Sequence, residues 1–402
     1  MKTCAPEEVG FSADRLQRIN TKMQSYVDDG KLAGIVTLVA RHGKIAHFEK
    51  FGMRDIAAEK PMELDTIVRV YSMTKPIVSV ALMMLYEQGL FRLADPISKF
   101  IPEFKDPKVY VDDGKLVDAE RPPTIRDFLR HTAGIGYGGY PEPMHPVDAM
   151  YDEQGIGLDY SSMTLGELSR EIGKLPLLYH PGRKWHYSYA ADVVGHLVEV
   201  IADMPIADFF EERIFSPLGM ADTSFVIPQG KIDRFAKLYA QTDDEVLGKI
   251  ENNEQITGRF DGATRLHSTG GGLISTAADY LRFSQLILNK GELDGVRVLG
   301  RKTVELMTMN HISPDLMPLG LEGDTMPGIG FGLGFSVLMN PAAAAVMGSV
   351  GTHGWGGMAS TTFWIDPQED MTAILMTQYI PGDDSHPVTD EFYTLVYQAL
   401  VD

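Results

Sequence analysis

The residues best suited to chemistry stand close together in the stretch Val-Tyr-Ser-Met-Thr-Lys-Pro at positions 70–76. A serine hydroxyl becomes a nucleophile once a base removes its proton, and a neutral lysine amine is such a base. Apolar residues recur from Ile77 to Leu85 at helical spacing, and Pro76 fits only the first turn of a helix. We therefore expect a buried helix that begins near Ser72 and carries Lys75 one turn later on the same side.

The helix start itself adds to this chemistry, because backbone N–H groups and partial positive charge at that end stabilise a developing oxyanion. Matches to S-x-x-K are nevertheless common by chance, and the apolar run by itself indicates only a core helix. The chemistry needs two further groups, namely an acid or base for the leaving group and a second oxyanion donor.

The acid/base candidate is Tyr187, in the stretch Trp-His-Tyr-Ser-Tyr at positions 185–189, just before a helix expected to begin near Ala190. A phenol at the end of a loop can project into a cleft and relay a proton between Ser72, Lys75 and a leaving group. The alternative is an aromatic ring that only packs against the following helix.

The donor candidate is the stretch Gly-Thr-His-Gly-Trp-Gly-Gly-Met at positions 351–358. Glycines at a strand edge let a substrate approach the backbone closely, and one N–H there can complete an oxyanion hole with the N–H of Ser72. The alternative is a β-bulge with a packed tryptophan, Trp355.

The elements that must position these motifs are strands at both ends of the chain and helices between them. The expected elements near the ends are helices over Glu7–Tyr26 and Asp390–Val401 and strands over Ile35–Ala40, Ile45–Phe51, Gly330–Val337, Ser360–Ile365 and Thr372–Thr377. Helices are expected in the middle over Pro122–Leu129, Asp192–Ala202, Asp208–Phe215 and Asp279–Leu288.

This order predicts an α+β fold, with one antiparallel sheet built from both termini and a helical domain inserted into it. We expect residues 1–76 and 330–402 to form a discontinuous α/β sheet domain and residues 77–329 to form the mainly helical inserted region. The active site then lies between the two.

Two irregular stretches invite functional interpretations. Residues 136–157 are rich in glycine and aromatic residues and include Tyr137, Met144 and Met150, which suits either a lid over an acyl pocket or a plain surface loop. The three adjacent glycines at 270–272 are not followed by Gly-Lys-Ser/Thr, so we expect close backbone packing near a cleft rather than a phosphate cradle.

Composition excludes several classes of function. The chain has 402 residues, 44% of them hydrophobic, which is enough for a large core in one big domain or two interleaved ones. Its 36 basic and 55 acidic residues give a net charge of −19, which argues against nucleic acid or an anionic membrane as partner.

Cysteine and histidine usage narrows the chemistry further. The single cysteine, Cys4, excludes an internal disulfide framework, and the 11 histidines include no H-E-x-x-H pair, so we expect neither metal nor cofactor. The sequence shows neither a signal peptide nor a run of about 18 apolar residues. The expected location is therefore the cytoplasm, and the expected partner is a small molecule.

Taken together, the Ser72/Lys75 pair, Tyr187 and the Trp-Gly-Gly edge at 355–357 resemble the serine β-lactamase-like superfamily in order and placement. That superfamily includes class C β-lactamases, D,D-peptidases and family VIII carboxylesterases. The resemblance extends across nearly the whole chain and implies a β-lactamase/transpeptidase-like fold.

The resemblance also implies roles for individual residues. Ser72 is the acylated nucleophile, Lys75 its proton acceptor and Tyr187 the partner acid/base. The backbone N–H groups of Ser72 and Met358 form the oxyanion hole, or Gly356 replaces Met358 if positions 353–355 correspond to the lactamase Lys-Thr-Gly. The expected substrate-lining residues are Trp355, Gly356, Gly357, His353, Tyr189 and Tyr137.

Departures from the lactamase pattern favour one branch of the superfamily. Class C enzymes usually read Tyr-x-Asn, whereas Tyr189 stands in place of the asparagine, and Trp355 with two glycines replaces Lys-Thr-Gly. Without that lysine, an uncharged ester fits better than a β-lactam acid. The Trp-Gly-Gly edge and the Tyr-Ser-x-x-x-Asp-Val spelling at 187–193 look most like family VIII esterases.

We therefore expect a serine carboxylesterase that hydrolyses short- to medium-chain esters through an acyl-enzyme on Ser72, with weak β-lactamase side activity. The enzymatic alternatives are a class C-like β-lactamase, a D,D-peptidase or amidase, and an acyltransferase with the same site. The alternative without turnover is a penicillin-binding-like sensor. Whether Lys75 or Tyr187 is the main base stays open, because coupled groups titrate as a pair.

Overall fold

The computed structural model describes residues 1–111, 114–138, 145–156, 163–241, 247–250, 260, 262–321, 324–381 and 386–402. Within these ranges, nine strands pair into one large sheet. They are β1 (Lys2–Thr3), β2 (Gly34–Arg41), β3 (Lys44–Asp55), β4 (Lys60–Pro61), β15 (Ile329–Phe331), β16 (Ser336–Leu338), β17 (His353–Gly357), β18 (Thr361–Asp366) and β19 (Met371–Thr377).

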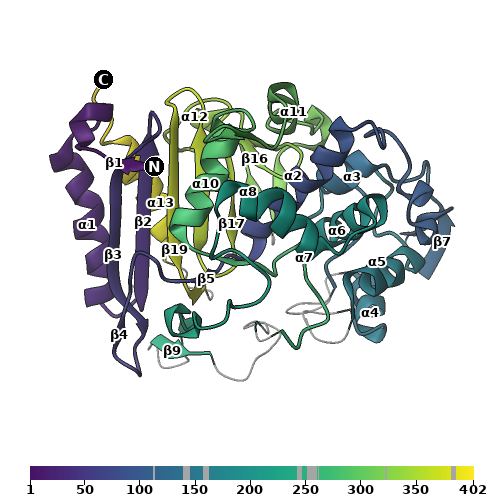
Figure 1. Ribbon diagram of the computed structural model, residues 1–402. Coiled ribbons are helices and arrows are strands. Elements are labelled where there is room, and N and C mark those ends of the chain that lie inside the picture. The colour runs from purple at the N-terminus through teal and green to yellow at the C-terminus, as the bar shows by residue number, and fades with distance from the viewer. Residues whose placement is uncertain are drawn as a thin grey trace.

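The sheet joins the two ends of the chain. Its strands follow the order β1-β3-β2-β19-β18-β17-β16-β15, and β4 pairs with β3 (Figure 1). The N-terminal hairpin meets the C-terminal strands where β2 pairs antiparallel with β19. Apart from the two-residue β1, which runs parallel to β3, the pairs are antiparallel. The antiparallel sheet expected from both termini is confirmed.

Helices supply most of the remaining regular structure. The described α-helices are α1 (Ala13–Asp28), α2 (Thr74–Glu87), α3 (Ile125–Leu129), α4 (Pro146–Glu153), α5 (Leu165–Lys174), α6 (Ala190–Ala202), α7 (Ile206–Phe210), α8 (Ser216–Leu218), α10 (Ala277–Leu288), α11 (Arg301–Met307), α12 (Pro341–Ala344) and α13 (Val388–Tyr397).

Short strands form small sheets outside the large one. They are β5 (Val68–Arg69) with β10 (Ile274–Ser275), β6 (Lys108–Val111) with β7 (Lys115–Asp118), β11 (Glu292–Leu293) with β12 (Val296–Arg297), β13 (Leu319–Leu321) with β14 (Asp324–Met326), and β8 (Tyr239–Gln241) with β9 (Leu247–Lys249) and β20 (Tyr379–Ile380).

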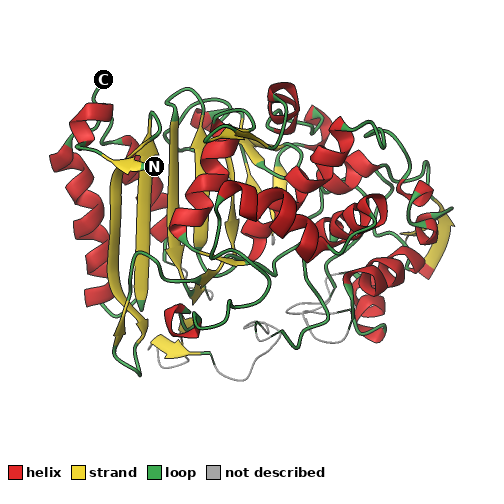
Figure 2. Ribbon diagram, in the orientation of Figure 1, coloured by secondary structure: helices red, strands yellow, loops and turns green. Residues whose placement is uncertain are grey.

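Helices cover both faces of the large sheet (Figure 2). On one face, α1 and α13 pack on a core that includes Val39 and Trp364, and on the other face α10 and α2 share a core with Leu38 and Phe363. Because both faces are covered, all residues of β2 are buried and the strand is a nearly continuous apolar run. Helix α2 is buried on nearly all sides and lies between the sheet and the other helices (Figure 1).

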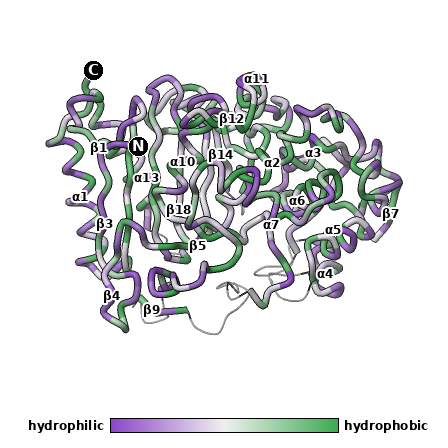
Figure 3. The backbone as a smooth tube through the Cα atoms, viewed as in Figure 1, coloured by the Kyte–Doolittle hydropathy of each residue, from purple (hydrophilic) through white to green (hydrophobic). Residues whose placement is uncertain are grey.

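The N-terminal helix shows how sequence signals set an element. The Ser12 side chain caps α1 by accepting from the N–H of Arg15, and the buried residues of the helix recur at helical spacing. Hydropathy accordingly alternates along α1 (Figure 3). The expected start at Glu7 is wrong, because Pro6–Val9 forms a separate 3-10 turn that Gly10 ends at φ +77°.

Other expected elements also differ in detail. Residues 330–337 are not one strand, because Gly334 turns the chain at φ +93° and the halves pair as β15 and β16. The helix expected over 208–215 changes from α7 into a π-helical turn at Glu211–Phe215. In the glycine-rich stretch 136–157, α4 includes Met150, whereas Met144 lies outside the described residues. The lid stays a prediction.

The expected division into two regions stays a prediction. The large sheet takes its strands from residues 2–61 and 329–377, and α10, from the intervening segment, packs on it. The division at 76/77 and 329/330 is not tested by this arrangement. Among the described residues, no helix combines the length and apolarity needed to cross a bilayer.

Candidate active site

The Ser72/Lys75 pair lies where β5 runs into α2. Residues Tyr71–Met73 form a 3-10 turn, and α2 begins directly after it at Thr74. Tyr71, just before the serine, has φ +41°, a left-handed conformation that is costly for a residue with a bulky side chain. Its ring is buried, so the surrounding packing holds the turn that presents Ser72.

Lys75 is buried, with 2% of its surface exposed, and its amine contacts neutral groups. The Nζ atom lies 3.0 Å from Ser72 Oγ and donates to the carbonyl of Gly270 at 2.6 Å. It also lies 4.5 Å from the centre of the Tyr187 ring. No ion pair within the described ranges includes Lys75. The amine is therefore held in place without a carboxylate in direct contact.

Tyr187 reaches the same serine from 115 residues further along the chain. It lies in the loop before α6, and its hydroxyl is 2.7 Å from Ser72 Oγ. Trp355 Nε1 donates to the Tyr187 hydroxyl at 3.4 Å. Ser72 Oγ is thus within hydrogen-bond distance of both an amine and a phenol, and either group can accept its proton when deprotonated.

An uncharged histidine backs the Tyr187 ring. The ring centres of His131 and Tyr187 are 4.9 Å apart, and His131 Nδ1 shares a hydrogen bond with Ser188 Oγ at 3.3 Å. Burial, followed by the charge of Lys75, holds the pKa of His131 well below its ordinary value. His131 is therefore neutral near pH 7 and adds no second cation beside Lys75.

Three tyrosines stack next to the reacting groups. Tyr137 lies parallel to Tyr187, with ring centres 5.6 Å apart, and parallel to Tyr189 at 4.5 Å. Tyr189 is 5% exposed and continues the stack to Tyr151 at 6.3 Å. The position at which class C enzymes usually carry an asparagine is thus filled by a packed aromatic ring.

The glycine-rich edge expected to supply the second oxyanion donor is β17, and it packs against the Ser72 turn. A Cβ on Gly357 would lie 2.4 Å from the carbonyl oxygen of Val70, so only glycine allows this approach. Met358 follows directly and packs against the cluster that contains Tyr71. The fold therefore brings the Trp-Gly-Gly edge and Met358 beside the nucleophile.

Two residues of this edge have different surroundings. Trp355 packs against Tyr187 and Phe331, with ring centres 5.6 and 5.3 Å away. His353, two residues earlier, is 4% exposed, donates from Nδ1 to the carbonyl of Gly351, and packs edge-on against Phe335. Burial lowers the pKa of His353 to about 4. Both residues were expected to line the substrate. Trp355 lies beside Tyr187, whereas His353 is buried against Phe335.

Sequence reasoning missed the carbonyl of Gly270 as the second partner of Lys75. The only signal was the run of three glycines, for which we expected close backbone packing. That packing is present, because a Cβ on Gly270 would lie 2.4 Å from Asp192 Oδ2.

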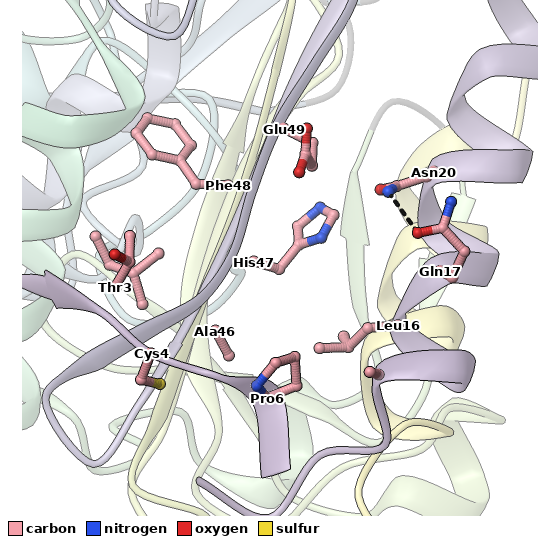
Figure 4. A pocket seen from close by; sticks show the side chains of 12 residues that line it. Thr3, Cys4, Pro6, Leu16, Gln17, Asn20, Ala46, His47, Phe48 and Glu49 are labelled. Carbon is pink, nitrogen blue, oxygen red and sulfur yellow. Dashed lines mark hydrogen bonds between the residues drawn. The ribbon is translucent and has the colours of Figure 1, made fainter. Parts of the chain in front are cut away.

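A cavity of about 310 Å³ lies on the other face of the sheet, beneath α1 (Figure 4). Its lining includes Gln17, Asn20, His47 and Glu49, and none of the residues expected to react. His47 is bonded to Thr37 at 2.7 Å, and burial lowers its pKa to about 4. Within the described part of the chain, no three His, Cys, Asp or Glu side chains gather as a metal site, and the expectation of no metal or cofactor stays a prediction.

A family model described as Beta-lactamase matches residues 19–398. The chain belongs to the β-lactamase family. This β-lactamase-family chain is 34% identical over 363 residues to Protein Rv1367c of Mycobacterium tuberculosis, with 88% of each chain covered. It is also 30% identical over 415 residues to Esterase EstB of Burkholderia gladioli, and the match covers 99% of this chain and 100% of the relative.

A solved structure supports the same assignment. The structure of "EstCE1, a hydrolase with promiscuous acyltransferase activity" is 28% identical, with a TM-score of 0.80, and the match covers 97% of this chain and 98% of that one. The β-lactamase-family chain thus has the β-lactamase/transpeptidase-like fold with mixed α and β content. It is a serine hydrolase with carboxylesterase-like relatives.

Proposed function

We propose that this chain is a serine carboxylesterase that hydrolyses uncharged esters with short- to medium-chain acyl groups through an acyl-enzyme on Ser72. The observation that carries the proposal is the double contact of Ser72 Oγ, at 3.0 Å from Lys75 Nζ and 2.7 Å from the Tyr187 hydroxyl. A nucleophile with two proton-transfer groups in reach has a base for the attack and an acid for the leaving group.

The first half of the reaction forms the acyl-enzyme. Ser72 Oγ attacks the ester carbonyl while Lys75, as the neutral amine, accepts the hydroxyl proton. The tetrahedral oxyanion receives hydrogen bonds from the N–H groups of Ser72 and Met358, with Gly356 as the alternative second donor. Tyr187 then passes a proton to the departing alcohol, and the Ser72 ester remains.

The second half reverses these proton transfers. Water enters where the alcohol left, loses a proton to the Lys75 and Tyr187 pair, and attacks the acyl carbonyl. Collapse of the second tetrahedral intermediate releases the carboxylic acid and returns the proton to Ser72. Either member of the pair can serve as the main base, because both lie within hydrogen-bond distance of Ser72 Oγ.

The surroundings of the site favour an uncharged substrate. The stretch 353–358 contains no lysine that would pair with a substrate carboxylate. Tyr189 stacks on Tyr137 and offers an aromatic ring in place of an amide. We propose that Trp355, Gly356, Gly357, His353, Tyr189 and Tyr137 line the substrate. β-Lactam hydrolysis then remains a weak side activity, because the stretch 353–358 offers no lysine and position 189 no amide to a lactam acid.

Relatives support this proposal and suggest one alternative. The names Esterase EstB and Lovastatin esterase, the latter 27% identical over 400 residues, favour ester substrates. EstCE1 is described as having acyltransferase activity beside hydrolysis, so transfer of the acyl group to an alcohol instead of water is the second candidate. The two reactions share the acyl-enzyme and differ only in the acceptor.

Parallel turnover of p-nitrophenyl butyrate, p-nitrophenyl octanoate and nitrocefin by the wild type and by Ser72→Ala tests the proposal. We expect rapid ester turnover, slow or absent nitrocefin turnover, and a loss of about 10⁴-fold or more in the variant. Intact-protein mass spectrometry after mixing with the butyrate ester is expected to show one added butyryl group in the wild type alone.

The matched control is Ser79→Ala, which removes a buried hydroxyl one turn after Lys75 on the same helix. This variant is expected to keep ester turnover. Preference for nitrocefin would favour the lactamase branch, and ester turnover that survives Ser72→Ala would overturn the site assignment. Faster product formation with added short alcohols, together with ester products, would favour the acyltransferase.

A further inference from the structure

A buried carboxylate, that of Asp192, is linked to the Lys75 amine through one residue, Gly270. Asp192 is in the first turn of α6 and is 1% exposed. Its Oδ1 atom accepts from Ser268 Oγ at 2.7 Å and from the N–H of Gly270 at 3.0 Å. Asp192 thus ties the start of α6 to the loop that carries Gly270.

Gly270 connects this carboxylate to the reacting amine. Its N–H donates to Asp192, and its carbonyl accepts from Lys75 Nζ at 2.6 Å. Thr269, the residue between Ser268 and Gly270, donates from Oγ1 to the carbonyl of Ala191 at 2.8 Å. Moving Asp192 therefore moves the carbonyl that orients the Lys75 amine.

The charges around Lys75 give Asp192 a second influence. The groups that face the amine are the Tyr137 and Tyr187 rings, the neutral His131, and Asp192 across the loop. Burial raises the pKa of Asp192, while its hydrogen bonds and the Lys75 charge oppose that rise. None of the ion pairs in the described ranges includes Asp192. The buried Oδ2 atom has no hydrogen-bond partner within the described ranges, and Lys75 is the cation whose charge acts on Asp192.

We propose that Asp192 is a positioning residue for Lys75, which holds the amine against Ser72 through its hydrogen bond to Gly270. This inference rests on the proposed acyl-enzyme reaction at Ser72. A nearby anion stabilises the ammonium form that Lys75 adopts after accepting the serine proton.

The test is the pH profile of kcat/KM for p-nitrophenyl butyrate in Asp192→Asn. The asparagine keeps an oxygen that accepts from Ser268 and Gly270 but removes the charge. Without that charge the ammonium form that Lys75 adopts during the reaction is less stable. We expect the acidic limb to move to lower pH by about one unit and the plateau to fall about tenfold.

Asp279→Asn is a matched control. Asp279 occupies the same helix position in α10, is 7% exposed, and accepts from the N–H of Asp222 at 2.7 Å and from Thr223 Oγ1 at 3.0 Å. Burial raises the pKa of Asp279 as it does that of Asp192. Neither of these two bonds reaches the loop that carries Gly270. We therefore expect Asp279→Asn to lose some stability and to keep the acidic limb of the wild-type pH profile.

An unmoved acidic limb and plateau in folded Asp192→Asn would overturn the inference, as would an equal shift in Asp279→Asn. If Asp192→Asn does not fold, Ser268→Ala replaces it. Loss of that hydroxyl raises the pKa of Asp192 and weakens its charge, so a smaller limb shift in the same direction is expected and an unmoved limb counts against the inference. Ester turnover that survives Ser72→Ala would contradict the proposed reaction itself. If Ser72→Ala is inactive and the acidic limb of Asp192→Asn does not move, only the role of Asp192 is contradicted.

Discussion

Two buried polar networks in this molecule are built in opposite ways. In the first, the Asp127 carboxylate on α3 is fully buried and receives two hydrogen bonds from Arg121 at 2.6 and 2.9 Å and one from Arg130 at 3.1 Å. Hydroxyl donors from Thr124 and Thr132 complete its shell. In the second, the Lys75 amine contacts a hydroxyl, a carbonyl and an aromatic ring.

Burial serves the fold in the first network and the chemistry in the second. The Asp127 network neutralises its charge directly and fixes each proton on a guanidinium or hydroxyl, so removing a member leaves an uncompensated charge. The Lys75 network holds an amine on neutral acceptors, so its proton can be exchanged with Ser72 and Tyr187. We expect substitutions in the first network to change stability and those in the second to change rate.

Lys75→Met is expected to give the largest effect. A thioether of similar length fills the space of the lysine but accepts no proton from Ser72, so ester turnover falls by about 10³- to 10⁴-fold. The variant is expected to lose about 1 kcal/mol of unfolding free energy, because the thioether fills the same space but the Gly270 carbonyl loses its donor. Turnover of p-nitrophenyl butyrate and urea unfolding measure the two quantities. Activity within tenfold of wild type would contradict the role of Lys75 as the proton acceptor.

Tyr187→Phe is expected to follow. The ring keeps its packing on Tyr137, but the hydroxyl at 2.7 Å from Ser72 Oγ is lost, so kcat falls by about 10²- to 10³-fold. The control is Tyr86→Phe, which changes a tyrosine that packs against Phe91 at the opposite end of α2 from Ser72. Stopped-flow acylation rates separate loss of the proton relay from a change in substrate binding. Equal acylation rates in wild type and Tyr187→Phe would contradict the relay.

Asp127→Asn is expected to change stability rather than rate. Burial raises the pKa of Asp127, but the bonds from Arg121 and Thr124 outweigh it and hold the pKa at about 2. We expect the variant to lose about 3 kcal/mol of unfolding free energy at pH 7 and to keep kcat within about threefold. Because the folded pKa is depressed below the unfolded value of about 4, this stabilisation is present above pH 4 and is lost as pH falls toward 2.

Urea unfolding at pH 7 and at several values between pH 4 and pH 2 measures that effect. The wild type is expected to lose stability through this window more steeply than Asp127→Asn. Parallel pH dependence of the two proteins would show that Asp127 contributes nothing through its charge.

Trp355→Phe is expected to have the smallest effect. The phenyl ring keeps an aromatic contact with Phe331 but cannot donate to the Tyr187 hydroxyl, a bond that is long at 3.4 Å. The expected loss in kcat/KM is about three- to tenfold, measured with the butyrate and octanoate esters. A loss as large as that of Tyr187→Phe would place Trp355 in the proton relay itself.

The sequence predicted the local parts of this molecule well. The spacing of Ser72 and Lys75 along one helix start, the apolar stripe of α1, and the neighbouring strands β2 and β3 follow from interactions between near neighbours. Gly334 was misread as part of a strand, because a turn of a few residues between two short strands looks like one apolar run.

The sequence predicted only part of the candidate site. Tyr187 was selected because it precedes an expected helix and because its motif resembles a family pattern, but its spacing from Ser72 gives no distance. Asp192 appeared only as the aspartate of the motif at 187–193, with no role of its own. The Gly270 carbonyl left no side-chain signal at all, since any residue has a backbone carbonyl and only the path of the chain decides what it meets.

What the sequence alone determined is the chemistry available, namely a serine and a lysine one turn apart, a phenol before a helix and an edge of glycines without a lysine. The tertiary structure decided which of these groups meet. It brings Tyr187 to 2.7 Å and the Gly270 carbonyl to 2.6 Å across separations of 115 and 195 residues. The physical reason is that helical and strand periodicity act over a few residues, whereas proton transfer needs atoms about 3 Å apart, and only the packing of the whole core sets such distances.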